Sequence, residues 1–163
     1  MLKQLRKSKE GFTIIEVMIV LAIAGLIILI VLLAVPAVER NSRNTAIKED
    51  ASSVSAAIGE FASNNDGAQP TAAKSTCSTG TASFNNATGT KSDAKVQGST
   101  AVSCGDATTT KVTPTPGTLY VDFGAKCAAV TATDVTPVAQ TRATAIVYAI
   151  ETTSGTTAKC LDS

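Results

Sequence analysis

The strongest feature of the hydrophobic pattern is an apolar run close to the N-terminus. Residues 17–35 include no charged or strongly polar side chain, which gives 19 consecutive apolar positions. Extended back to Phe12, the run reaches 24 residues and is interrupted only by Thr13 and Glu16. As a helix it measures about 36 Å, whereas the hydrocarbon core of a bilayer is about 30 Å thick. The pattern therefore predicts a helix over residues 12–35 that spans a membrane.

The residues ahead of this run, 1–11, carry a net positive charge. They carry one acidic side chain, Glu10, and four basic ones, Lys3, Arg6, Lys7 and Lys9. Basic flanks of a membrane span stay in the cytoplasm. We therefore expect the precursor to lie in the cytoplasmic membrane, with its N-terminus inside and its C-terminal part outside.

Two ordinary membrane segments explain this pattern incompletely. A secretory signal peptide has an apolar region of about 7–15 residues, which is shorter than this run. The small-x-small sequence Ala22-Ile23-Ala24 lies in the middle of the run, where a signal peptidase would not meet it. A passive anchor explains everything except Glu16, because a carboxylate inside a spanning helix costs about 2.5–3.5 kcal/mol.

After Pro36 the chain becomes polar but keeps a helical period. Apolar residues recur at spacings of 4, 3, 4 and 3: Ile47, Ala51, Val54, Ile58 and Phe61. We assign the opposite, solvent-facing side to Arg43, Lys48, Asp50 and Ser53. The sequence Asn64-Asn65-Asp66-Gly67 predicts the end of the helix. The pattern thus indicates one broken helix over residues 12–63, with an amphipathic second half that packs on a sheet.

Residues 64–163 are rich in Thr, Ala, Ser and Gly and predict a small β-sheet head. Residues 68–116 show little periodicity, so we expect a long loop region with one short strand near residues 95–103. Alternation at Leu119, Val121 and Phe123 predicts a strand over residues 118–123, with residues 126–131 as its partner. The expected fold class is α+β, with three or four antiparallel strands on the amphipathic half of the helix.

The last part of the head predicts two further strands. Residues 143–152 are apolar on both faces, as in a central strand. The turn Ser154-Gly155 then leads into a short strand over residues 157–161.

Composition excludes several kinds of chemistry. The chain has no histidine, so neither a histidine zinc site nor a histidine general base can form. Its net charge is +1, but residues 1–11 supply +3, and the rest of the chain nets −2 with 10 basic and 12 acidic residues. We therefore expect no nucleic-acid partner, and we assign Lys91, Lys95, Lys111 and Lys126 to an ordinary solvated surface. The residues predict no enzyme activity, cofactor or metal.

The four cysteines all lie in the head: Cys77, Cys104, Cys127 and Cys160. The predicted orientation places them outside the cytoplasm, where disulfides form. Their spacings of 27, 23 and 33 residues differ from the paired CxxC spacing of four-cysteine zinc sites. Two disulfides are therefore expected, in any of three pairings. Asn86-Ala87-Thr88 is a formal glycosylation sequon, which we attribute to chance in a chain rich in Thr and Ser.

The stretch Gly11-Phe12-Thr13-Ile14-Ile15-Glu16-Val17 resembles the class III signal of type IV pilins and type II secretion pseudopilins. The resemblance combines the basic leader, the Gly-Phe junction, the glutamate and the apolar helix, and it covers about the first 50 residues. It implies that a prepilin peptidase cuts between Gly11 and Phe12 and N-methylates Phe12. It also implies that Glu16 pairs with the N-terminal amine of a neighbouring subunit and sets the register of assembly.

The resemblance further implies a structural subunit that leaves the membrane to form a surface filament. A homo-oligomeric helical filament, a prepilin peptidase, an assembly ATPase and a platform membrane protein are the partners it implies. Gly25 and Pro36 resemble the positions where pilin helices kink or loosen. The preferred disulfide pairing is Cys77–Cys104 and Cys127–Cys160, because the second would resemble the C-terminal disulfide loop of pilins.

Two other functions are consistent with the sequence. A type II secretion pseudopilin would form a short periplasmic assembly, and a membrane-tethered binding domain would not polymerise at all. Adhesion, motility and DNA uptake share the filament architecture, so the sequence does not choose among them.

Overall fold

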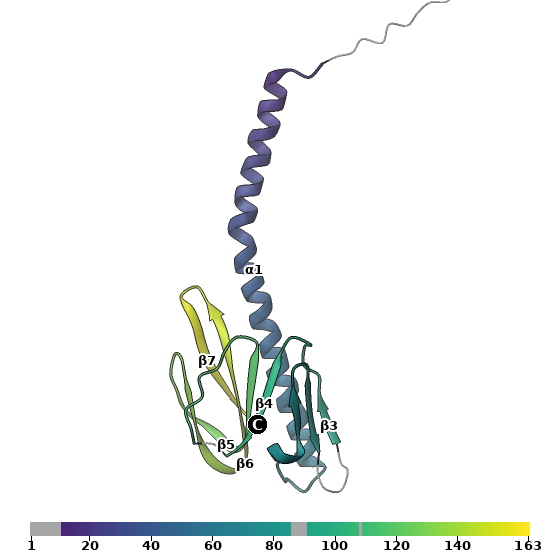
Figure 1. Ribbon diagram of the computed structural model, residues 1–163, viewed down its shortest axis with the longest axis vertical. Helices are drawn as coiled ribbons and strands as arrows, with labels where there is room; N and C mark the ends of the chain where they lie inside the picture. Colours follow the sequence, from purple (N-terminus) through teal and green to yellow (C-terminus); the bar gives the residue numbers. More distant parts are fainter. Residues whose placement is uncertain (1–10, 86–90, 108) are drawn as a thin grey trace, which may run out of the picture. The chain divides into compact units, whose positions relative to one another are not determined.

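The computed structural model describes residues 11–85, 91–107 and 109–163 (Figure 1). The basic residues 1–10 and the sequon Asn86-Ala87-Thr88 lie outside this described part. The chain divides into two units, and the second runs from Arg40 to Ser163. The long helix α1 (Ile14–Ser63) begins in the first unit and ends in the second. It starts two residues later than predicted and ends at the predicted residue.

The N-terminal half of α1 is apolar on every side. Between Phe12 and Val38 the large apolar side chains are 43–87% exposed. By length and composition, α1 is the one helix of the described chain that could cross a membrane. The helix continues through Pro36, so this proline does not end it. A kink at Gly25 or Pro36 remains a prediction.

The C-terminal half of α1 is amphipathic, as predicted. The expected core residues are all buried: Ile47, Ala51, Val54, Ile58 and Phe61. The assignment of Asp50 to the solvent face was wrong, because this residue is only 3% exposed. Asp50 follows Ile47 by three residues, a spacing that places both side chains on the same face of a helix.

A three-stranded antiparallel sheet precedes the main sheet. Its elements, after the short 3₁₀ helix η1 (Ala72–Lys74), are β1 (Thr76–Ser78), β2 (Thr81–Asn85) and β3 (Lys91–Ala94). Their order in the sheet is β1-β2-β3. The prediction of a long loop over residues 68–116 was therefore wrong. Burial does alternate along β2 and β3, but the buried side chains include Ala82, Ser92 and Ala94, which are too small or polar to reveal the pattern.

The main sheet has four strands in the order β4-β5-β6-β7. They are β4 (Ala101–Asp106), β5 (Thr118–Val130), β6 (Val135–Thr152) and β7 (Gly155–Asp162). The pairs β5–β6 and β6–β7 are antiparallel, as expected, and β6 is central. The pair β4–β5 is parallel, so the expectation of a wholly antiparallel sheet was wrong. The α+β class itself is confirmed.

Residues 126–131 were predicted to pair with residues 118–123, and this was wrong as well. Residues 118–123 and 126–130 both belong to β5, which continues through Gly124. Gly124 has a positive φ of 74°, and the pairing register with β6 shifts at this point. Glycine tolerates such a backbone conformation without steric cost, so it marks a bulge here and not the end of a strand.

The buried side chains form two apolar clusters. The larger one joins the buried face of α1 to both sheets, and in it the rings of Phe84 and Phe123 meet edge to face at 5.8 Å. The smaller cluster contains Val135, Val147 and Ala158. Alternate residues of β6 supply the two clusters, which explains why this strand is apolar on both faces.

Both disulfides lie in the head. Cys77 of β1 is joined to Cys104 of β4, with Cα atoms 5.9 Å apart, and Cys127 of β5 is joined to Cys160 of β7, at 6.0 Å. This is the pairing preferred from the resemblance. The first bond connects the small sheet to the main sheet. The second connects two strands of the main sheet that are not neighbours.

Candidate functional site

The junction Gly11-Phe12 lies in a non-helical segment directly before α1. Gly11, Phe12 and Thr13 are all exposed, and Phe12 is 87% exposed. A Cβ added at Gly11 would meet no atom within 4 Å. The fold of this chain therefore does not require glycine at position 11. A requirement for glycine would have to come from an enzyme that binds the junction.

Thr13 and Glu16 cap the N-terminus of α1. The Glu16 Oε2 atom accepts hydrogen bonds from the Thr13 backbone N–H at 2.9 Å and from the Thr13 hydroxyl at 2.7 Å. The Glu16 backbone N–H donates in turn to Thr13 Oγ1 at 3.3 Å. This reciprocal arrangement is a capping box, which satisfies backbone donors that the first helical turn leaves unpaired.

The role of Thr13 was missed by the sequence reasoning. The signal was present, because Thr-x-x-Glu before an apolar run is the sequence form of a capping box. The structure therefore gives Glu16 a local function within its own chain. The capping box provides hydrogen bonds for the carboxylate but no positive charge, so a cation from elsewhere would still be needed in hydrocarbon.

Acidic side chains of the head have partners within the head. Asp93 forms an ion pair with Lys91 at 2.8 Å, and Asp106 accepts a hydrogen bond from the Ala72 backbone N–H at 2.7 Å. In the part of the chain that the structure describes, no group of side chains could hold a metal ion.

Residues 6–32 match the family model of the prokaryotic N-terminal methylation motif. The match extends from the basic leader through the Gly11-Phe12 junction and Glu16 into the apolar helix. The chain carries the class III signal of type IV pilins and pseudopilins. Searches among curated proteins and among solved structures found no significant match to the chain.

The signal indicates how the chain is processed and assembled. It implies processing by a prepilin peptidase and assembly into a pilus-type complex. The methylation signal and the long apolar helix together fit membrane insertion of the precursor. The α1 helix packed on β-sheets, with two disulfides in the head, is a pilin-like arrangement. The signal points to a structural protein of the pilin or pseudopilin type.

Proposed function

We propose that this protein is the structural subunit of a type IV pilus filament on the cell surface. Prepilin peptidase cuts the chain between Gly11 and Phe12 and methylates the new amine of Phe12. The subunit then leaves the cytoplasmic membrane and polymerises through the N-terminal half of α1. The head (residues 64–163) and the second half of α1 remain on the outside of the fibre.

The observation that carries this proposal is the exposed apolar surface of α1 directly after the signal. Leu33, midway between Gly25 and Asn41, is still 74% exposed. Such a surface needs lipid around it in the precursor and other apolar helices around it after extraction, because burial of apolar area is worth about 25 cal/mol per Å². A bundle of these helices in the fibre core would provide that burial.

Glu16 has a specific part in the proposed assembly. In hydrocarbon its charge needs a partner, and the protonated amine of Phe12 on a neighbouring subunit would supply one. Pairing of these two groups neutralises both and sets the axial register of the incoming subunit. An assembly ATPase and a platform membrane protein would supply the energy and the site of extraction.

Two disulfides in the head favour an exposed, long-lived fibre over a short periplasmic assembly. Each one closes a loop of about 30 residues and would stabilise the head by about 3.5 kcal/mol in the chain-entropy description. This contribution compensates for a core with few aromatic side chains.

Mass spectrometry of filaments sheared from intact cells tests the proposal. The expected result is a chain that begins at N-methylated Phe12, with both disulfides intact. An intact Met1 in the sheared material would refute the processing step. A processed chain that stays in the cell envelope and never enters sheared filaments would refute the pilus assignment and favour a pseudopilin.

A further inference from the structure

The Gly11–Phe12 bond lies just ahead of the first hydrogen-bonded turn of α1. In the described chain, the first helical hydrogen bond runs from the Val17 N–H to the Thr13 carbonyl, at 3.3 Å. Thr13 is therefore the N-cap of α1, the residue whose carbonyl accepts this first bond while its own backbone stays outside the helix. Gly11 and Phe12 precede the N-cap, so the bond between them is non-helical.

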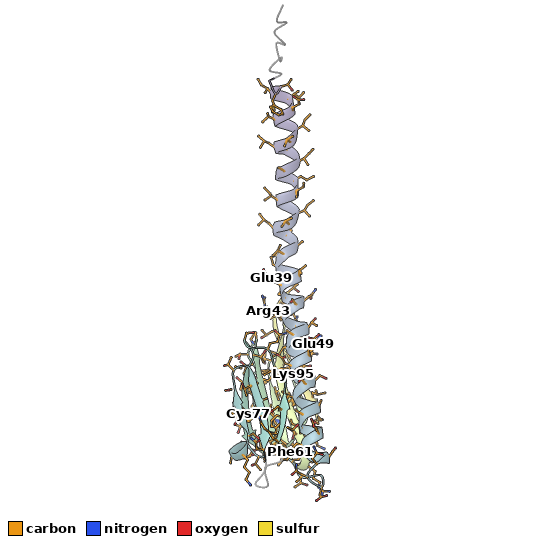
Figure 2. The ribbon with its side chains drawn as sticks, turned by 90° about the vertical axis from the view of Figure 1, so that its right-hand side faces the viewer. Glu39, Arg43, Glu49, Phe61, Cys77 and Lys95 are labelled. Atoms are coloured by element: carbon orange, nitrogen blue, oxygen red, sulfur yellow. A yellow bond between two sulfur atoms is a disulfide. The ribbon has the colours of Figure 1, made fainter. Side chains whose placement is uncertain are left out.

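The position of this helix start depends on local interactions. Thr13 Oγ1 accepts from the Glu16 N–H, and the Glu16 carboxylate accepts from the backbone N–H and the hydroxyl of Thr13. Packing within the chain gives little support, because Phe12 and Ile14 are 87% and 82% exposed. Figure 2 shows the side chains of this part of α1 pointing outward on all sides of the helix. The capping box therefore determines where α1 begins.

The sequence ahead of Thr13 favours continuation of the helix. Lysine and glutamate have high helix propensity, and Lys9 and Glu10 stand directly before Gly11. The next residue upstream with a capping side chain is Ser8. A helix capped by Ser8, or by Gly11 itself, would draw the Gly11 carbonyl into the helical hydrogen bonds. A specific stop at Thr13 is therefore needed to keep this carbonyl out of the helix.

The open backbone matters for the chemistry of the cut. Hydrolysis breaks the bond between the Gly11 carbonyl carbon and the Phe12 nitrogen, and water supplies the hydroxyl of the new carboxyl group and a proton for the new amine. In a helix the Gly11 carbonyl would accept a hydrogen bond from the Ile15 N–H, but the structure shows no such bond between these two residues. A Cβ added at Gly11 would meet no atom within 4 Å. The carbonyl carbon is thus accessible to a peptidase.

We propose that Thr13 is a positioning residue for the processing of this chain. Its capping box makes α1 begin two residues after Phe12, and so presents the Gly11–Phe12 bond to the prepilin peptidase as open, non-helical backbone. Thr13 acts through the position of the helix start and not through contact with the reacting atoms. This inference rests on the proposed cut after Gly11, and it does not depend on filament formation.

The test follows cleavage of the full-length precursor in detergent micelles by a purified prepilin peptidase, with the product identified by mass spectrometry. Thr13→Val keeps the shape of the side chain but removes the capping oxygen. We expect KM to rise about fivefold with kcat unchanged, because the cleavable conformation becomes less populated by the factor that corresponds to a lost N-cap. The ¹³Cα shifts of Gly11 and Phe12 should move towards helical values in this variant.

Variants that keep a cap separate this role from direct recognition of threonine. Thr13→Ser and Thr13→Asn both retain a good N-cap residue and should be cut as well as the wild type. Glu16→Gln should also be cut normally, because glutamine can serve in a capping box. Thr45→Val is the matched control, since this exposed hydroxyl of α1 donates to the Asn41 carbonyl at 2.9 Å, away from the junction. It should leave both kinetic constants unchanged.

The possible outcomes are distinct. Wild-type kinetics in Thr13→Val, or a change confined to kcat, would overturn the proposal. Slow cutting of Thr13→Asn would do so as well, because the peptidase would then read the threonine itself and not the cap. A wild-type chain that is not cut after Gly11 would refute the proposed processing, and this inference with it. Unchanged amide positions of β7 show that the head remains folded in each variant.

Discussion

Asp50 provides the sharpest test of how the head is held to α1. Its carboxylate is buried in the contact between α1 and the head, at 3% exposure. It accepts hydrogen bonds from the Gln97 backbone N–H at 3.1 Å and from the Thr100 hydroxyl at 2.5 Å. Asp50→Asn keeps the size of the side chain but replaces one acceptor by an NH₂ group. The Gln97 N–H can still donate to the remaining amide oxygen, but the Thr100 hydroxyl must turn and accept from the NH₂ group, and both hydrogen bonds lose their charge.

The structure sets the size of the expected effect. A hydrogen bond to a charged group contributes about 1.5–3 kcal/mol, and a neutral one about 1 kcal/mol. Replacing two charge-assisted hydrogen bonds by neutral ones should reduce the free energy of unfolding of the head by about 2 kcal/mol. For a domain of this size that corresponds to a fall in Tm of about 10 °C.

The assay is thermal unfolding of the full chain in detergent micelles, followed by the near-ultraviolet circular dichroism of the tyrosines. Amide hydrogen exchange at Gln97 reports the same contact locally and should accelerate in Asp50→Asn. Ser52→Ala, on an exposed position of the same helix, is the control and should change Tm by less than about 2 °C. A variant Asp50→Asn with unchanged Tm and unchanged exchange at Gln97 would show that this carboxylate does not hold the segment of Gln97 and Thr100 against α1.

Three further outcomes are expected. Hydrogen bonds, first from Thr113 and then from Lys111 and Thr133, lower the pKa of Asp134 from 3.8 to about 2. The resulting stabilisation is complete above pH 3.8 and is lost as the pH falls through about 2, so unfolding curves of wild type and Asp134→Asn should differ at pH 5 and converge below pH 2. Replacing both cysteines of the Cys127–Cys160 disulfide by serine should reduce the free energy of unfolding by about 3.5 kcal/mol in guanidinium titrations; a loss below about 1 kcal/mol would contradict the loop-closure argument. Glu16→Gln should abolish surface filaments in shearing assays while the precursor still inserts in the membrane, and normal filaments from this variant would refute the proposed role of the charge.

Elements with a pattern in their own residues were predictable. The apolar run over residues 17–35 and the period of Ile47, Val54 and Ile58 define the two halves of α1 without help from the rest of the chain. The β6–β7 hairpin was also predictable, because a strand with two apolar faces precedes a Ser-Gly turn. In each case the positions that are buried carry apolar side chains, so the sequence itself marks the element.

The small sheet and the path of β5 were not predictable, for a different reason. Ser92 is buried in β3 because it donates a hydrogen bond to Glu60 of α1 at 3.2 Å, a partner 32 residues away. Gly124 is typical of a turn, but here it permits a bulge within one long strand. The parallel pairing of β4 with β5 sets Ala101 opposite Thr118, which lies 17 residues later in the chain. None of these interactions has a signature in the local sequence.

The class III signal could be recognised from the sequence, but the role of Thr13 within it was missed. A peptidase must recognise it in a short stretch of chain, so its determinants lie together within residues 6–32. The resemblance assigns the charge of Glu16 to a neighbouring subunit. It gives no indication that the Glu16 carboxylate also accepts hydrogen bonds from Thr13 of its own chain. The two roles are compatible, since hydrogen bonds from Thr13 fix the position of the carboxylate and leave its charge uncompensated.

A carboxylate held at the start of α1, one turn after the new N-terminus, is preorganised to accept a cation there at little further cost in side-chain entropy. The capping box would therefore make the proposed pairing with the Phe12 amine tighter, because the negative charge already occupies the position that the incoming subunit must find.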